Sequence, residues 1–380
     1  MALSFGSMAH IQQIIAYFQQ LYYREMQRDC DVDDEHYWES QDDTQPPTLT
    51  TNRNGQMGES PAKSLTPFYQ NLAKKEVGEN AEHVMAHLTS FKRWLAASPH
   101  LKIPQVDTFL LSFLRYAHYD HALAQRRIDN FCTLRYSDKH ISPWYEYPKL
   151  DDPRLEKYLN AGIFVPLGFM DNGMYVILIR LASWSPAELD QVAMRAMNNM
   201  NFERLLFDQR CQIGGFTLFI DMAHTTMEQA TQWGDFKHAK SAFKLMQESS
   251  PGRVKNLIFY KETKLFDFAF KLAEVWLSEK MRNRVTRVKD DINKAFKKIP
   301  GLKDVLPMEY HGKNGTLEEA LARCNRELRE FYANGNVLQE IAVDESKRPS
   351  SARNYIREYK ELDQSMMGTS GTFIKLDPRD

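Results

Sequence analysis

Cysteine is scarce in this sequence of 380 residues: only four are present, and no two of them form a CxxC pair. Zinc ribbons need paired cysteines and small disulfide-stabilised domains need many of them, so both classes of protein are excluded. The wide spacing of Cys30, Cys132, Cys211 and Cys324 is typical of a reduced, cytosolic protein.

Long hydrophobic runs are also missing. No segment contains roughly 18 apolar residues in succession, so we expect none to span a bilayer. The stretch MALSFGSMAHIQQIIAYFQQ has no basic residue before its apolar part, and glutamines interrupt that part. It is therefore a poor secretory signal.

Neither sign of charge is in excess, because 49 Lys and Arg residues face 50 Asp and Glu residues. This balance argues against a general nucleic-acid binder, and we expect no nucleic-acid partner. Four common signatures of nucleotide-binding loops, hydrolases and zinc proteases are absent: GxGxxG after a strand, GxxxxGK[ST], GxSxG and HExxH. We therefore predict no catalytic residue, no cofactor and no metal.

Three weaker candidates for chemistry remain. His83 and His87 lie one helical turn apart, but without a third ligand at a suitable spacing a helix-packing role is favoured over zinc binding. Asp221 ends an apolar strand, where α/β enzymes often place a carboxylate. No His or Ser partner is evident, so a structural role is favoured, and an enzyme using Asp221 stays as an alternative. HGKNGT at 311–316 follows no strand and is interpreted as a turn.

The composition changes along the chain. Residues 9–27 can form an amphipathic helix, whereas 31–66 contain eight carboxylates, two cations and few aliphatic side chains. Such a segment buries too little to offset its ordering entropy, so we expect a disordered linker. Apolar residues then recur at helical spacing in three segments up to residue 137, the second of which can begin at Asp107. This pattern predicts a small three-helix module.

The central part contains continuous apolar runs of strand length, which are YVILIRL (175–181), FTLFID (216–221) and NLIFY (256–260). Such runs are typical of strands covered on both faces. Because helical segments alternate with them, we expect an α/β fold with a mostly parallel sheet.

Three capping signals predict where helices of this part begin, since Ser or Thr followed three residues later by Glu can form a capping box. The signals are Ser185 with Glu188, Thr225 with Glu228, and Thr316 with Glu319.

The segment KLFDFAFKLAEVWLSEKMRNRV (264–285) is too apolar for an ordinary surface helix. Its apolar arc covers roughly 220° of a helical projection. A helix of this kind packed only on the sheet leaves an exposed apolar patch that soluble proteins seldom tolerate, so it needs apolar contacts on both sides. Four cations come soon after its apolar part, which ends at Leu277: Lys280, Arg282, Arg284 and Arg287.

Several separated motifs follow one another along the chain: AGIF (161–164), DNGMYVILIRLASWSP (171–186), GGFTLFID (214–221), PGRVKNLIFY (251–260), LSEKMRNRV (277–285) and LPMEYHG (306–312). In this order they resemble the CRAL-TRIO lipid-binding family, and FLLSFLRYAHYDHALAQRRI (109–128) resembles the helical module that precedes that domain. The resemblance implies an α/β/α sandwich whose sheet floors an apolar pocket under a lid helix.

Together, composition and resemblance predict five regions. These are an N-terminal helix with an acidic disordered linker (1–66), a helical module (67–143), a lipid-binding domain (144–313), a C-terminal helix (314–343) and a flexible tail (344–380).

The resemblance also implies the site residues. The expected ligand-binding residues are Met197, Phe216, Leu218, Ile220, Leu245, Met246, Leu257 and, on the lid, Phe266, Ala269, Phe270, Ala273 and Leu277. The expected phosphoinositide-binding residues are Arg253, Lys255, Lys280 and Arg284. One basic position of the family's cationic patch is Ala117 here.

The predicted function is that of a non-enzymatic carrier, cytoplasmic and only transiently peripheral at membranes, which transfers a tocopherol-, retinoid- or carotenoid-like lipid by lid-gated exchange. Its expected partners are this hydrophobic ligand and an anionic or phosphoinositide-containing membrane surface. Besides an enzyme using Asp221, two alternatives stay open: exchange of phosphatidylinositol or another phospholipid, and a membrane-sensing interaction module.

Overall fold

The computed structural model describes residues 64–139, 141–226, 228–229, 232, 241, 245–246, 248–262 and 283–350. The predicted N-terminal helix, the acidic linker and the lid segment therefore lie outside the described residues.

The elements of the first half are α2 (Pro67–Val77), α3 (Val84–Ala96), β1 (Leu101–Lys102), α4 (Asp107–Tyr116), α5 (His121–Ser137), η2 (Ser142–Tyr145), α6 (Pro153–Ala161), β2 (Phe164–Phe169), β3 (Tyr175–Arg180), η3 (Leu181–Ser183), α7 (Gln191–Leu205) and α8 (Gln209–Gly214). Those of the second half are β4 (Phe216–Asp221), β5 (Val254–Tyr260), β6 (Val285–Val288), α13 (Asn293–Lys298), α14 (Leu302–Val305), η4 (Met308–Tyr310), α15 (Leu317–Tyr332), η5 (Val337–Glu340), β7 (Ala342–Val343) and η6 (Glu345–Lys347).

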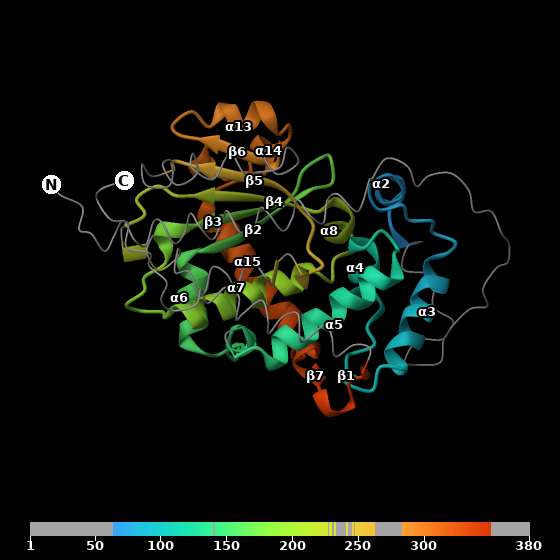
Figure 1. Cartoon of the computed structure of the whole chain (residues 1–380). Helices are drawn as coiled ribbons and strands as arrows, with labels where there is room; N and C mark the ends of the chain where they lie inside the picture. The colour runs from blue at the N-terminus through green and yellow to red at the C-terminus, as the bar shows by residue number, and fades with distance from the viewer. Residues whose placement is uncertain are drawn as a thin grey trace, which may run out of the picture.

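A five-stranded sheet with the order β2-β3-β4-β5-β6 forms the centre of the fold. β2 and β3 are antiparallel, and the other neighbours are parallel. The predicted apolar runs form β3, β4 and β5, which confirms the α/β class and the mostly parallel sheet. Figure 1 shows the strands side by side, with α7 below them and α2, α3 and α4 to their right.

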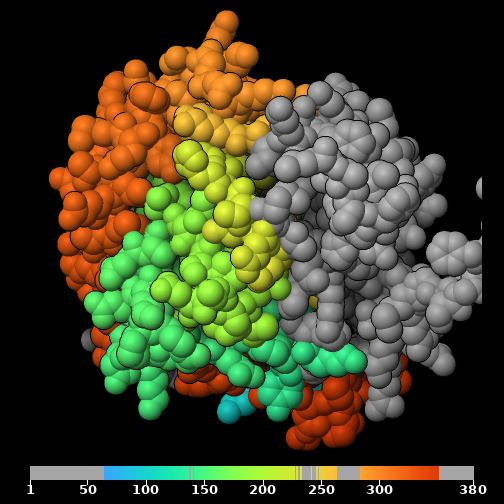
Figure 2. Space-filling model, turned by 90° about the vertical axis from the view of Figure 1, so that its left-hand side faces the viewer, coloured from blue at the N-terminus to red at the C-terminus, as the bar shows by residue number. Residues whose placement is uncertain are grey.

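Helices cover both faces of this sheet. On one face, Val176, Phe219 and Ile258 pack against α13, α14 and the first half of α15. On the other face, Tyr175 and Phe216 pack against residues of α7 and α8. The architecture is thus an α/β/α sandwich. In Figure 2 the segments after residue 283, coloured orange, form one flank beside the green and yellow central segments.

The N-terminal module contains α2, α3, α4 and α5. Phe91, Phe109, Phe113 and Phe131 belong to one buried cluster shared by the last three helices. α4 begins at Asp107, as predicted. The additional helix, α2, was not identified from the sequence because its buried side is narrow, with only Tyr69, Ala73 and Val77.

Of the three helix starts predicted from capping signals, one is confirmed. The capping box of Thr316 and Glu319 opens α15, as predicted. The prediction at Ser185 was wrong: α7 starts after Asp190, whose carboxylate accepts hydrogen bonds from the backbone of Val192 and Ala193. Residues 185–189 instead form a turn, which the Trp184 indole closes by donating to the carbonyl of Leu189.

The third start was wrong by one residue. Thr226 and Gln229, rather than Thr225 and Glu228, form the reciprocal pair, in which each side chain accepts a hydrogen bond from the other's backbone. Gln229 is the better partner because its amide also donates to the carbonyls of Ala182 and Trp184, which anchors this turn to the segment after β3.

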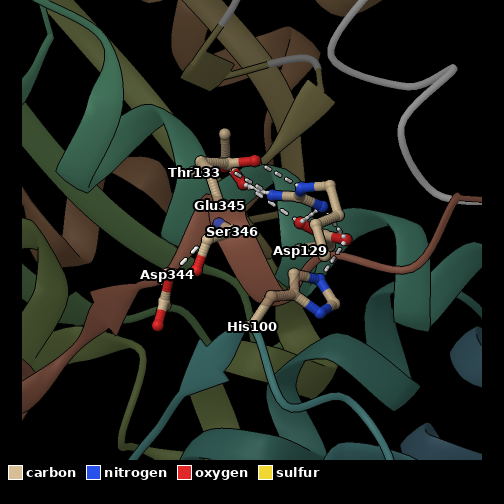
Figure 3. A network of polar contacts seen from close by, with 7 residues as sticks. His100, Asp129, Thr133, Asp344, Glu345 and Ser346 are labelled. Atoms are coloured by element: carbon tan, nitrogen blue, oxygen red, sulfur yellow. Dashed lines mark hydrogen bonds and ion pairs between the residues drawn. The ribbon is translucent and has the colours of Figure 1, made fainter.

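A buried ion network ties the C-terminal part of the chain to α5 (Figure 3). The Arg348 guanidinium donates to both carboxylate oxygens of Asp129, at 2.8 and 2.7 Å, and to Thr133 and Glu345. His100 lies 3.1 Å from the same Asp129 carboxylate. Beside this network, β7 pairs with β1. Residues 344–348, which the sequence assigns to the flexible tail, are therefore bonded to the helical module.

Replacing Arg348 by Met is expected to lower the free energy of unfolding by about 3–5 kcal/mol, because the substitution leaves the Asp129 carboxylate buried without its cation. Urea denaturation measures this change.

The matched control is Arg326→Met, which removes an ion pair with Glu330 whose two side chains are 64% and 69% exposed. It should change the free energy of unfolding by no more than about 0.5 kcal/mol. Equal effects of the two substitutions would contradict the importance assigned to the network.

Candidate functional site

The face of the sheet that meets α7 and α8 carries two rows of apolar side chains. Parallel strands in register place partner residues on the same face, so the rows can be read from the pairing. The first row is Ile177, Leu218 and Leu257, and the second is Ile179, Ile220 and Phe259.

This face is closed at the amino ends of the strands and half-open towards their carboxyl ends. At the closed end, Phe216 is 1% exposed, and its ring centroid lies 5.1 Å from that of Phe202. Further along the strands Leu218, Ile220 and Leu257 are only half-buried.

The opposite face differs in its burial. Phe219 and Ile258 alternate with these residues along the same strands, and both are 0% exposed. The apolar side chains of that face are thus all buried, whereas the other face combines buried side chains such as Ile177, at 0% exposure, with half-buried ones. Covering the remaining exposed area with an apolar molecule is favourable by about 25 cal/mol per Å².

The structure brings some of the expected ligand-binding residues together. Leu218, Ile220 and Leu257 share the half-buried face, and Phe216 lies at its closed end. Met197 lies instead in another buried cluster, with Tyr158 and Trp184.

The remaining expected residues lie elsewhere. Leu245 belongs to a third cluster, with Ile141 and Trp144, and Met246 is 41% exposed. The expected lid residues, which are Phe266, Ala269, Phe270, Ala273 and Leu277, lie outside the described residues.

Four side chains of the apolar face were not identified from the sequence: Ile177, Ile179, Phe259 and Phe202. The first three were detectable, because each belongs to a predicted apolar run and lies two positions along its strand from another residue of the same face. Phe202 belongs to α7, and its contact with Phe216 depends on how that helix lies on the sheet.

An ion pair bounds the second apolar row. Arg287 is the register partner of Phe259 on β6. Its guanidinium donates twice to the carboxylate of Glu262, at 2.8 and 2.6 Å. The Glu262 side chain is 1% exposed, so polar atoms lie at the edge of an otherwise apolar face.

The cations expected to bind phosphoinositides lie at the other end of the strands, around one carboxylate. Lys255 is hydrogen-bonded to the Glu76 carboxylate of α2, and Arg253 lies 3.4 Å from it. Arg253 also donates to the backbone carbonyls of Ile213 and Glu76, at 2.9 and 3.1 Å. Arg284 immediately precedes β6 and is half-buried. Lys280 lies outside the described residues.

The charges of this cluster influence one another. Burial lowers the pKa of Arg253 and of Lys255, and the nearby charge of Arg284 lowers both further, whereas Glu76 acts in the opposite direction. Burial alone would raise the pKa of Glu76, but the hydrogen bond from Lys255 and the charges of both cations outweigh it, so this pKa is lowered. Glu76 is thus held as a carboxylate.

A glycine pair allows the strand β4 to begin beside these cations. A Cβ at Gly214 would lie 1.9 Å from the carbonyl oxygen of Gly173, which no side chain allows. Gly215 has a φ of 73°, and a Cβ there would lie 2.7 Å from the carbonyl oxygen of Arg253. That carbonyl accepts a hydrogen bond from the backbone of Phe216 at 2.8 Å, which fixes the start of the sheet next to the cluster.

The weaker candidates have structural partners. Asp221 accepts hydrogen bonds from the Tyr310 hydroxyl at 2.7 Å and from the backbone of Ala223 at 2.9 Å, in agreement with the favoured structural role. HGKNGT is a turn, in which His311 has a φ of 57°. Ala117, at the C-terminal end of α4, is 2% exposed.

His87 does not pair with His83 but with His121, at a ring nitrogen distance of 2.9 Å. Within the described ranges, no group of three His, Cys, Asp or Glu side chains is arranged to hold a metal ion. Nor is any helix in those ranges both long enough and apolar enough to cross a bilayer.

A small pocket lies between α6 and the segment after β3, lined among others by Tyr158, Trp184 and Leu189. Its volume of about 40 Å³ suits a water molecule and not a lipid. It is separate from the half-buried sheet face.

Comparison with known proteins finds one matching domain family and several similar proteins. Residues 159–312 match the profile of the CRAL/TRIO domain. The alpha-tocopherol transfer protein-like protein of Mus musculus is 26% identical over 260 residues, which are 68% of this chain and 73% of that protein. Clavesin-2 of Rattus norvegicus is 22% identical over 250 residues, 65% of this chain and 75% of its own. The crystal structure of Sfh5 aligns with 78% of this chain and 98% of its own, with 14% identity and a TM-score of 0.41.

The His87–His121 pair predicts a loss of stability in acid. Burial, and then the neighbouring histidines, lower the pKa of His87 from 6.5, and burial lowers the pKa of His121. The unfolded chain therefore binds protons more readily than the folded one. The stabilisation that comes from keeping this pair neutral is fully present above about pH 6.5 and is lost as the pH falls below that value.

His87→Gln should show a smaller fall of the urea midpoint between about pH 7.5 and pH 5 than the unchanged protein. Leu88→Ala is the control, because a lost apolar contact lowers the midpoint by the same amount at every pH. A His87→Gln curve parallel to that of the unchanged protein would contradict the assignment.

Proposed function

The chain belongs to the CRAL/TRIO family, and on this premise we propose that it is a cytoplasmic, non-enzymatic carrier that moves a hydrophobic lipid between membranes. The single observation that carries the proposal is the half-buried apolar face of Leu218, Ile220 and Leu257, set against an opposite face whose apolar side chains are buried. A folded protein gains nothing from leaving such a face partly open unless another apolar molecule covers it.

A tocopherol-, retinoid- or carotenoid-like isoprenoid is the proposed cargo. Removing about fifteen CH₂ equivalents from a membrane costs about 12 kcal/mol, which only an apolar pocket of similar size can offset. The name of one relative, alpha-tocopherol transfer protein-like, supports this ligand class. Transfer is then an exchange between two states of similar free energy, limited by the opening of the pocket.

The lid of this pocket is proposed to be the segment 264–277. Its residues Phe266, Ala269, Phe270, Ala273 and Leu277 recur at helical spacing and would cover the ligand from the side opposite the sheet. Met197, Leu245 and Met246 stay candidates for more distant parts of the pocket wall.

Membrane contact is proposed to involve the cation cluster of Arg253, Lys255 and Arg284, together with Lys280. Each such cation contributes about 1 kcal/mol near an anionic membrane surface. The cluster contains more positive than negative charge, which supports binding of a phosphoinositide head group.

Exchange of a phospholipid is a second candidate function. The ion pair of Arg287 and Glu262 favours it, since it puts hydrogen-bonding groups at the edge of the apolar face, where a lipid head group would lie. Competition between fluorescent tocopherol and phosphatidylinositol for the purified protein separates the two candidates.

The direct test is mass spectrometry of lipids extracted from the protein purified out of lipid-containing cells. We expect one hydrophobic molecule for each protein chain, and uptake of fluorescent tocopherol or retinaldehyde from neutral vesicles. If no lipid is recovered and neither probe is taken up, the carrier proposal is wrong.

Leu257→Asp is expected to weaken uptake of such a probe by at least about tenfold, because an apolar ligand would cover an unpaired carboxylate at a cost above about 1.4 kcal/mol. Met308→Asp is the control, since Met308 is 56% exposed and belongs to η4, away from the apolar face. Circular dichroism verifies that both variants are folded. Equal uptake by the two variants would remove Leu257 from the ligand site.

A further inference from the structure

The carboxylate of Glu76 occupies the position between Arg253 and Lys255 where an anion can contact both cations. It comes from α2, 177 and 179 positions away in the chain from Arg253 and Lys255. Among the described residues, two cations thus contact the Glu76 carboxylate, and the charge of a third, Arg284, acts on both of them.

The two cations that contact this carboxylate are held differently. Arg253 also donates to the carbonyls of Ile213 and Glu76, so its guanidinium keeps its position without the carboxylate. For Lys255 the Glu76 carboxylate is the hydrogen-bond acceptor seen among the described residues. Moving the Glu76 side chain therefore frees one ammonium group and one guanidinium N–H.

α2 can stay in place when this side chain moves. Glu79, just beyond the end of α2, accepts two hydrogen bonds from the buried guanidinium of Arg115, at 2.6 and 3.0 Å. Arg115 also donates to Gln212 of α8 at 2.8 Å. The Glu76 side chain itself is 25% exposed, so it can turn towards water without unfolding the helix.

We propose that the Glu76 carboxylate competes with a phosphate group for the same cations. A phosphate group must displace this carboxylate to bind Arg253, Lys255 and Arg284. Glu76 therefore determines how selectively the cluster binds phosphorylated head groups. The inference rests on the membrane-contact part of the proposed function and adds its specificity-determining residue.

The charges of possible ligands support this selectivity. A phosphomonoester carries close to two negative charges and three acceptor oxygens near neutral pH, more than one carboxylate offers. It can therefore replace Glu76 and engage all three cations. A phosphodiester head group with a single charge gains no such advantage, and weakly anionic membranes are rejected.

Glu76→Gln tests the proposal, because it removes the competing charge and retains the size of the side chain. The probes are phosphatidylcholine vesicles that contain a few mole per cent of phosphatidylinositol bisphosphate, phosphatidylserine vesicles of matched total charge, and soluble inositol trisphosphate. Vesicle sedimentation and calorimetry measure binding by the full-length chain.

We expect Glu76→Gln to bind the bisphosphate vesicles about fivefold more tightly, since one elementary charge near an anionic membrane corresponds to about 1 kcal/mol. Its binding to phosphatidylserine vesicles should increase by a larger factor, because that lipid displaces the Glu76 carboxylate poorly, so the preference for the phosphorylated lipid decreases. Lys255→Gln should bind the bisphosphate vesicles more weakly than the unchanged protein.

The matched control is Glu156→Gln, which makes the same change of net charge at an exposed position in the first turn of α6. Figure 1 places α6 and α2 on opposite sides of the molecule. An unchanged or weaker affinity of Glu76→Gln, or an equal gain in Glu156→Gln, overturns the proposal.

The measurements with inositol trisphosphate identify the source of the phosphate, and a parallel uptake measurement tests the carrier function separately. A gain with inositol trisphosphate equal to that with vesicles identifies a free inositol phosphate as the ligand, and a gain confined to vesicles identifies a lipid; both support the role of Glu76. Uptake of fluorescent tocopherol from neutral vesicles, measured in parallel, tests the carrier function independently, because those vesicles carry no phosphomonoester.

Discussion

The unequal covering of the two sheet faces is the constraint on which the rest of this structure depends. Parallel strands bury both faces, so each strand presents apolar residues in both directions. α13, α14 and α15 bury the apolar side chains of one face, among them Phe219 and Ile258. On the other face, α7 and α8 cover only the amino ends of the strands, and Leu218, Ile220 and Leu257 stay half-buried. In the proposed function, an apolar ligand covers this remaining area.

Buried polar networks hold the helical module against this sheet. Arg115 joins Glu79 to Gln212 of α8, and Arg348 joins Asp129 to the last described residues. Such groups are costly to bury, and they contribute specificity because few alternative arrangements satisfy all their hydrogen bonds. They also fix α2 beside the amino ends of β4 and β5. The same constraint that builds the module therefore places a carboxylate, Glu76, against the cations of the sheet.

The two ends of the strands consequently have different chemistry. The amino ends carry cations, backbone turns and a competing carboxylate, whereas the apolar rows lie along the strands and end near Arg287 and Glu262. Under the proposed function, contact with a membrane and storage of a lipid fall to separate parts of one sheet. A carrier needs this separation, since a charged group under the cargo would oppose its binding.

Local patterns in the sequence determined the three apolar strands, the start of α4 at Asp107, the capping box at Thr316 and the resemblance to the CRAL/TRIO family. Each depends on residues close together in the chain, whose spacing alone specifies a strand, a helix start or a motif. Only the tertiary structure decided that Leu257 shares a half-open face with Leu218 and that Glu76 meets Lys255. These contacts join residues far apart in the chain, and their partners depend on strand register and helix docking, which periodicity does not encode.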